Sequence, residues 1–139
     1  MPASFRILPD LGLVHVRYEG AVRLAETAAL FAEYAGHPDR GAGQKQLVDL
    51  SAITSFERDY VTLVQLQAQK ADIFPSGEGD TMIVYLAPSD MAFDLARLIL
   101  RSWDGIPGVI ATAQRSEAEA LSLLGLDGMT LADLARRPA

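Results

Sequence analysis

Cysteine is absent from this sequence of 139 residues, and histidine occurs only at His15 and His37. Without cysteine the chain has no disulfide, no thiolate nucleophile and no sulfur-ligated metal site, which fits a reducing compartment. The two histidines lie too far apart in sequence to indicate a metal centre. We therefore expect neither a metal nor a cofactor.

Positive charge is also scarce. Twelve basic residues stand against eighteen acidic ones, which gives a net charge of −6. No overall positive field exists to attract a phosphate backbone, so we expect no nucleic-acid partner.

Long apolar runs are missing, although 50% of the residues are hydrophobic. The first ten residues, MPASFRILPD, do not resemble a secretory signal, and no run reaches membrane-spanning length. We expect a single domain over residues 1–139, with no membrane insertion and a cytoplasmic location.

The usual catalytic motifs are missing too. Gly36, Gly41 and Gly43 follow a predicted helix instead of opening one, and no GK[ST] motif occurs, which argues against the familiar nucleotide sites. Ser89 lacks the glycine-flanked turn of a hydrolase serine, so helix capping is the preferred interpretation. No nucleophile–base pair or carboxylate dyad can be named, and we expect no enzyme activity.

The hydrophobic pattern predicts an α/β fold with a mixed β-sheet, helices packed on the sheet and the element order β-β-α-β-α-β-α-β-α. The expected strands are residues 4–8, 13–18, 46–50, 82–87 and 109–112. The first two form a hairpin around the turn at 9–12, and 82–87 is apolar enough to be covered on both faces. The expected helices are 22–35, 59–74, 91–103, 116–124 and a short one after Thr130, with an exposed, mobile loop at 76–80. Ser116 with Glu119, and Thr130 with Asp133, have the spacing of capping boxes.

One junction combines strand, hydroxyl and charged residues: VDLSAITSFERDYVTL, residues 48–63. A structural interpretation is a capped helix start, because Thr54 and Glu57 have capping-box spacing and Glu57 and Asp59 complement the positive helix end. A functional interpretation adds a docking edge, since ligands and partners bind beyond the carboxyl ends of strands in open α/β sheets. Three loops, 51–59, 88–90 and 112–115, are expected to meet there with two helix N-termini. The candidate binding residues are Ser51, Thr54, Ser55, Glu57, Arg58, Asp59, Ser89, Asp90 and Arg115.

The element order, together with the strand end Val48-Asp49-Leu50-Ser51, resembles the STAS domain of anti-sigma-factor antagonists. The resemblance covers nearly the whole chain in element order, but its local motif is short. In switch-type members an Asp-Ser-Ser-Gly-Leu motif follows, in which a serine is phosphorylated. Here residues 57–61 read Glu-Arg-Asp-Tyr-Val and offer no hydroxyl at Arg58 or Asp59. The resemblance thus implies a divergent, switch-less STAS-like protein, and some of these are similar in fold to small lipid carriers.

Two functions follow. The first is a non-catalytic regulatory module that docks a protein partner at the junction near residues 49–60. The second is a carrier or sensor of a small apolar ligand, suggested by the small side chains Ala25, Ala28, Ala29 and Ala32, which otherwise indicate close helix-to-sheet packing. A homodimer is also predicted, because open sheet edges need covering. Trp103 and Phe93 are either core residues or anchors of that contact.

Overall fold

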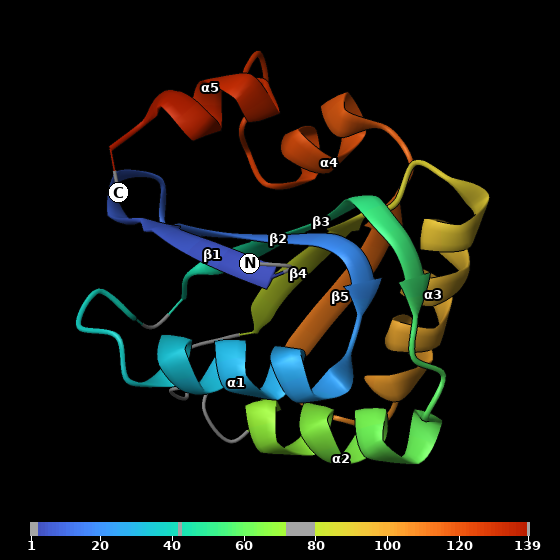
Figure 1. Ribbon diagram of the computed structural model, residues 1–139. Coiled ribbons are helices and arrows are strands. Elements are labelled where there is room, and N and C mark those ends of the chain that lie inside the picture. Colours follow the sequence, from blue (N-terminus) through green and yellow to red (C-terminus); the bar gives the residue numbers. More distant parts are fainter. Residues whose placement is uncertain (1–2, 42, 72–79, 139) are drawn as a thin grey trace.

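A five-stranded sheet with strand order β1-β2-β3-β4-β5 forms the centre of the computed structural model, which describes residues 3–41, 43–71 and 80–138 (Figure 1). β1 is antiparallel to β2, and the other neighbours are parallel. The mixed-sheet α/β class and the predicted element order are confirmed. The strands are β1 (Ala3–Leu8), β2 (Leu13–Val22), β3 (Lys45–Phe56), β4 (Thr81–Leu86) and β5 (Val109–Gln114).

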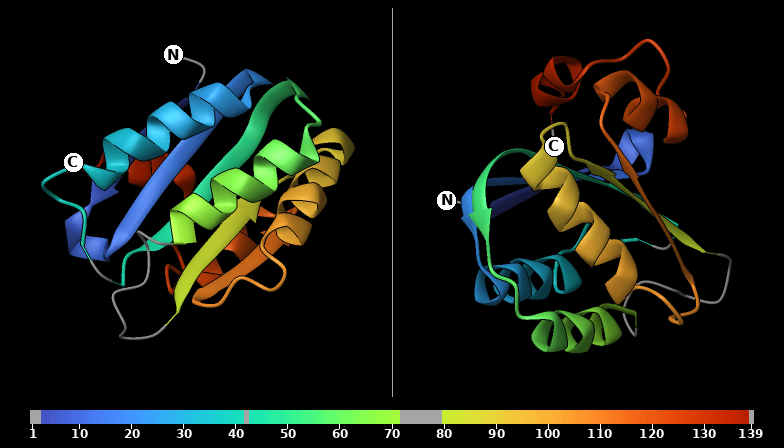
Figure 2. Two further views of the ribbon diagram at one scale, coloured as in Figure 1. Left: turned by 90° about the horizontal axis from the view of Figure 1, so that it is seen from below. Right: turned by 90° about the vertical axis from the view of Figure 1, so that its right-hand side faces the viewer.

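Helices cover both faces of the sheet. α1 (Leu24–Ala35), α2 (Tyr60–Ala71) and α3 (Asp90–Ser102) lie across one face, and α4 (Glu117–Leu123) and α5 (Leu131–Arg136) lie on the other (Figures 1 and 2). The three crossovers from β2 to β5 all step in the same direction along the sheet. Because parallel crossovers are right-handed, this places their helices on one face. The chain after β5 then folds back over the opposite face.

Each face of the sheet has its own apolar core, because successive strand residues point to opposite sides. In β4, Ile83 and Tyr85 belong to the core under α1 to α3, whereas Val84 and Leu86 belong to the core under α4 and α5. The prediction that this strand is covered on both faces is confirmed. The second core is completed by fully buried leucines from several elements: Leu8, Leu13, Leu47, Leu121 and Leu134.

β2 and β3 extend well beyond the predicted strand ends at residues 18 and 50. β3 pairs with β4 only as far as Asp49, after which it continues beside β2 alone. Two register shifts in this stretch each insert one extra residue into β3. Such bulges bend a strand and increase its twist, and Gly20 takes the positive φ of 69° that the bend requires. We call residues 19–22 and 52–56 the β2–β3 arm. The predicted loop at 51–59 is therefore wrong over most of its length.

The alanines of α1 do not face the sheet, contrary to the packing that their small side chains indicated. Leu24, Thr27 and Tyr34 are buried, whereas the alanines that suggested a ligand site, Ala25, Ala28, Ala29 and Ala32, are exposed. Spacing of three and four from Leu24 leads through Thr27 and Phe31 to Tyr34, a stripe that the alanine-rich sequence hides. The predicted end of the next helix at residues 72–74 and the loop from 76 lie outside the described residues, apart from Asp80.

Three of the predicted helix caps are present. Ser89 Oγ accepts a hydrogen bond from the Ala92 amide at 3.1 Å, and Ser116 Oγ accepts one from Glu119 at 3.2 Å. Thr130 and Asp133 form a complete capping box. These caps satisfy helix amides that have no partner within their own helix, and so they fix where α3, α4 and α5 begin.

The second core gives a test with a matched control on α4. Leu121 is 1% exposed and Leu123 is 44% exposed. We expect Leu121→Ala to lower the free energy of unfolding by about 2–5 kcal/mol, because it leaves a cavity. Leu123→Ala should change it by about 0.5 kcal/mol or less. Urea unfolding measures both, and similar losses for the two variants would contradict this packing of α4.

Candidate functional site

Glu57 leaves the end of β3 and caps a helix that precedes it in the chain. Its Oε1 accepts a hydrogen bond from the Leu24 amide at the start of α1, at 2.9 Å, and its own amide donates to the Val22 carbonyl at 3.0 Å. The carboxylate also complements the positive end of α1. The predicted capping box between Thr54 and Glu57 is wrong, because Thr54 lies within β3.

Asp59 caps α2. Its carboxylate accepts hydrogen bonds from the Thr62 amide at 3.1 Å and from the Thr62 hydroxyl at 2.7 Å, while its carbonyl accepts from the Leu63 amide at 3.0 Å. The two bonds from Thr62 stabilise the ionised carboxyl and lower the pKa of Asp59. This is the cap that the sequence pattern assigned to Thr54.

Arg58 lies between these two caps, and its guanidinium carbon is 4.4 Å from the centre of the Phe56 ring. Arg58 is exposed, as are Thr54 and Ser55 on the β2–β3 arm. Of the candidate residues in this segment, these three keep their side chains available to a partner.

Ser89, Asp90 and Arg115 lie at a different place. Arg115 Nη2 is 2.9 Å from Asp90 Oδ1 at the start of α3. The start of α2 instead lies by the end of α3, where the Arg101 guanidinium is 5.6 Å from the Tyr60 ring. Asp90 and Arg101 are eleven positions apart on the helix, a rise of about 16 Å. The predicted docking edge is therefore divided, because the β2–β3 arm carries residues 57–59 away from the sheet edge.

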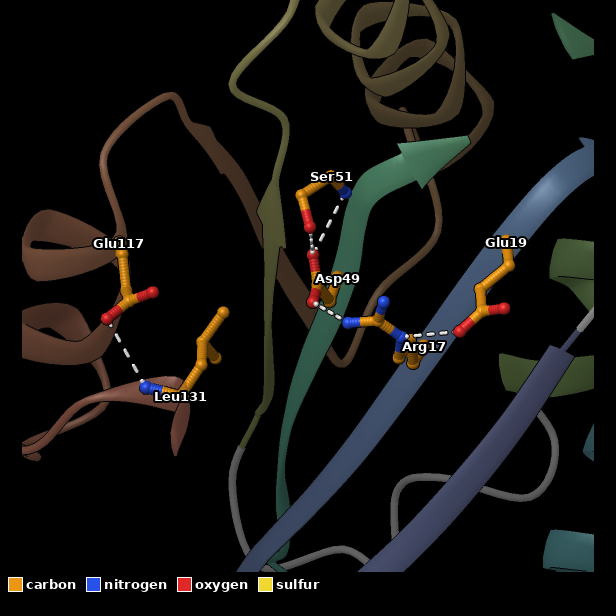
Figure 3. A network of polar contacts seen from close by, with 6 residues as sticks. All are labelled: Arg17, Glu19, Asp49, Ser51, Glu117 and Leu131. Carbon is orange, nitrogen blue, oxygen red and sulfur yellow. Dashed lines mark hydrogen bonds and ion pairs between the residues drawn. The ribbon is translucent and has the colours of Figure 1, made fainter. Parts of the chain in front are cut away.

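Ser51 takes part in a polar network on the side of the sheet that α4 and α5 cover (Figure 3). Its hydroxyl donates to Asp49 Oδ1 at 2.6 Å, and its amide donates to the same oxygen at 2.9 Å. Arg17 Nη1 lies 3.4 Å from the other oxygen of Asp49. Asp49 is 1% exposed, so these donors are what allow its charge to be buried. The Ser51 hydroxyl serves a structural carboxylate in this arrangement.

A cavity of about 80 Å³ lies inside the first core, between the sheet and α1, α2 and α3. Its aliphatic lining includes Val16, Val48, Leu63, Ile83 and Leu95. Glu57 lies at the border of the cavity near the start of α1. The sequence did not predict this site, because the spacing of apolar residues does not report whether helix and sheet meet without a gap.

Several polar groups also line the cavity, and most are paired. Trp103 Nε1 donates to the Tyr85 hydroxyl at 3.0 Å, and the Tyr18 hydroxyl donates to Thr27 Oγ1 at 3.1 Å. Burial raises the pKa of Tyr85, so its hydroxyl stays protonated.

Trp103 is 5% exposed, which makes it a core residue and not an interface anchor. The predicted homodimer stays a prediction.

Gln67 is 1% exposed and lines the cavity from α2. Its Nε2 donates to Ser102 Oγ at 3.2 Å, and Ser102 in turn donates to the Ile99 carbonyl. Because the Ser102 proton is already used, the amide nitrogen and not the oxygen of Gln67 must face Ser102. Gln67 Oε1 has no hydrogen-bond partner within the described part of the chain. A buried acceptor is therefore left unpaired in the cavity lining.

Other kinds of site find no support in the described residues. Between residues 3 and 138, apart from 42 and 72–79, His, Asp and Glu nowhere gather in a group of three that could hold a metal ion. Over the same residues, no helix has the length and apolar character needed to cross a membrane. No protein-family model matches the chain, and no curated protein matches it.

The cap at Asp59 gives a pH-dependent prediction. Its pKa lies below the ordinary value of 3.8, so the cap stabilises the fold fully above that value and loses its effect as the pH falls through the lowered pKa. Asp59→Ala should lower the melting temperature at neutral pH, and the difference from the wild type should shrink in acid. Arg58→Ala, the neighbouring control, should leave stability unchanged. An Asp59→Ala effect of equal size in acid would refute the cap.

Proposed function

We propose that the protein binds a small, largely apolar molecule in the cavity between the sheet and α1 to α3, as a non-catalytic carrier or sensor. The observation that carries the proposal is the cavity itself, about 80 Å³ inside the apolar core. Protein interiors are close-packed, with few voids larger than a water molecule. One water needs about 10–15 Å³, so the cavity is large enough for a molecule the size of about five to eight waters.

The lining suits a molecule that is apolar over most of its surface. Val16, Val48 and Ile83 form the floor on the sheet, and Leu63 with Leu95 come from α2 and α3. Ligand sites in proteins are mostly apolar concave spaces with a few placed polar groups, which here include the unpaired Gln67 Oε1. The resemblance to switch-less STAS-like proteins, some of them similar in fold to lipid carriers, supports the same proposal.

Native mass spectrometry of protein purified gently from its own cells tests this function. We expect a population whose mass exceeds that of the chain by one small molecule, which denaturation releases. The empty protein should also be stabilised by hexan-1-ol, by about 2.7 kcal/mol at a hundred times the dissociation constant. A bare chain together with no stabilisation by hexan-1-ol would refute the proposal.

Variants that fill the cavity locate the binding. Val48→Phe should abolish stabilisation by hexan-1-ol, and Val48→Leu, which adds one CH₂ group and strains the core less, should weaken it. Ala28→Phe introduces the same aromatic side chain on the exposed side of α1 and should bind hexan-1-ol like the wild type. Undiminished binding by both Val48 variants would place the ligand elsewhere.

A second candidate function is the docking of a protein partner by a STAS-like regulatory module. It is supported by the apolar side chain of Val61, 67% exposed in the first turn of α2, beside the exposed Arg58. Neither side chain makes a hydrogen bond of the helix caps, whereas Glu57 and Asp59 do. Arg58 is thus the position at which docking can be tested without loss of a cap.

For this second function, Arg58→Glu should abolish capture of the partner while the melting temperature stays that of the wild type. Arg136→Glu makes the same change of charge on α5, on the opposite face of the sheet, and should leave capture intact. Affinity purification from the source cells measures both. Equal capture by the wild type and Arg58→Glu would eliminate this surface.

A further inference from the structure

Lys70 is a cation in the lining of the cavity. It follows Leu63 and Gln67 on α2 at a spacing of four and three residues, so the three side chains share the helix face that lines the cavity. Lys70 is half-buried, and its Nζ lies 5.8 Å from the centre of the Phe31 ring of α1. Burial lowers the pKa of Lys70 to about 8. The ammonium is therefore partly removed from water, with the Phe31 ring beside it.

No carboxylate neutralises this ammonium among the described residues. The ion pairs found there join Arg17 to Glu19 and Asp49, Arg115 to Asp90, and Arg136 to Asp133. Among the described residues, the acidic one in the cavity lining is Glu57, which caps α1. It precedes α2, and the helix rises about 15 Å between Tyr60 and Lys70. A half-buried ammonium that has no carboxylate partner among the described residues leaves a place for an anion at the Lys70 end of the cavity.

We propose that the ligand of this cavity is a small amphiphilic monocarboxylate, with its apolar body inside the core and its carboxylate paired with Lys70. This inference rests on the proposed ligand-binding function and names the chemical class of the ligand. One ammonium matches one negative charge, whereas a phosphate group carries more charge and three acceptor oxygens. The limited space favours a body of about six carbons over a long lipid chain.

The unpaired Gln67 Oε1 adds a second constraint on this ligand. It lies three residues before Lys70, a rise of about 4.5 Å along α2. This buried acceptor can take a hydrogen bond from a donor of the ligand or from a water that the ligand retains. We therefore expect either a hydroxyl group of the ligand or an ordered water next to Gln67 when the carboxylate is paired with Lys70.

Isothermal titration with hexanoate, hexan-1-ol and hexylamine tests the inference, because the three probes share a chain and differ in charge. Hexanoate should bind most tightly, and Lys70→Met should weaken it by about tenfold or more, a much larger loss than the same variant causes for uncharged hexan-1-ol. Lys70→Arg should restore much of the affinity for hexanoate. Equal hexanoate affinity in the wild type and Lys70→Met, or tighter binding of hexan-1-ol than of hexanoate, would overturn the inference while the proposed cavity function stood. Binding of none of the three would overturn both.

The chain provides its own control, since Lys45 is its only other lysine. Lys45 Nζ donates to the Leu124 carbonyl at 3.2 Å, away from the cavity, so Lys45→Met should bind hexanoate like the wild type. The two lysines can also be dimethylated with ¹³C, which keeps their charge. Hexanoate should then shift the NMR signal of Lys70 and not that of Lys45. A shift at Lys45 alone would contradict the placement.

Discussion

The β2–β3 arm is the constraint on which the candidate sites depend. Beyond Asp49, β3 loses its pairing with β4, and two extra residues bend it together with β2 out of the sheet. The arm carries the starts of α1 and α2 away from the edge where α3 begins. It thereby divides the predicted docking edge, and it contributes Val22 to the wall of the cavity. A strand that ended at Leu50 would instead have placed residues 57–59 near Ser89.

The two carboxylates after the arm fix the geometry of the helical layer. Glu57 caps α1 from a distant part of the chain, and Asp59, two residues later, caps α2. The helix starts are thus held side by side through one short segment. Glu57 and Asp59 were candidate binding residues. They instead accept hydrogen bonds from backbone amides that have no partner within their own helix. Between them, Arg58 faces solvent.

The cavity combines features that a core selected for stability alone would lack. An unpaired buried acceptor such as Gln67 Oε1 costs about 1–3 kcal/mol, and the Lys70 ammonium adds a desolvation cost of its own. Empty apolar space adds lost dispersion contacts. Stability given up at one place in a core is characteristic of a functional site. The proposed ligand offsets two of these costs, since it fills the space and pairs the charge, and a water retained beside it would donate to the Gln67 acceptor.

The sequence by itself determined the elements, their order and the α/β class, because period and capping are local properties. The continuous apolar run in β4 and the caps at Ser89 and Thr130 could be identified from neighbouring residues alone. The length of β3 could not be predicted, because Thr54 and Glu57 have the spacing of a capping box. The extension of β3 depends on pairing with β2, more than thirty residues earlier. Nor could the cavity be predicted, because a gap between helix and sheet is set by how far their backbones stand apart. Only the tertiary structure decided that Glu57 belongs to α1 and that Gln67 and Lys70 line a common space.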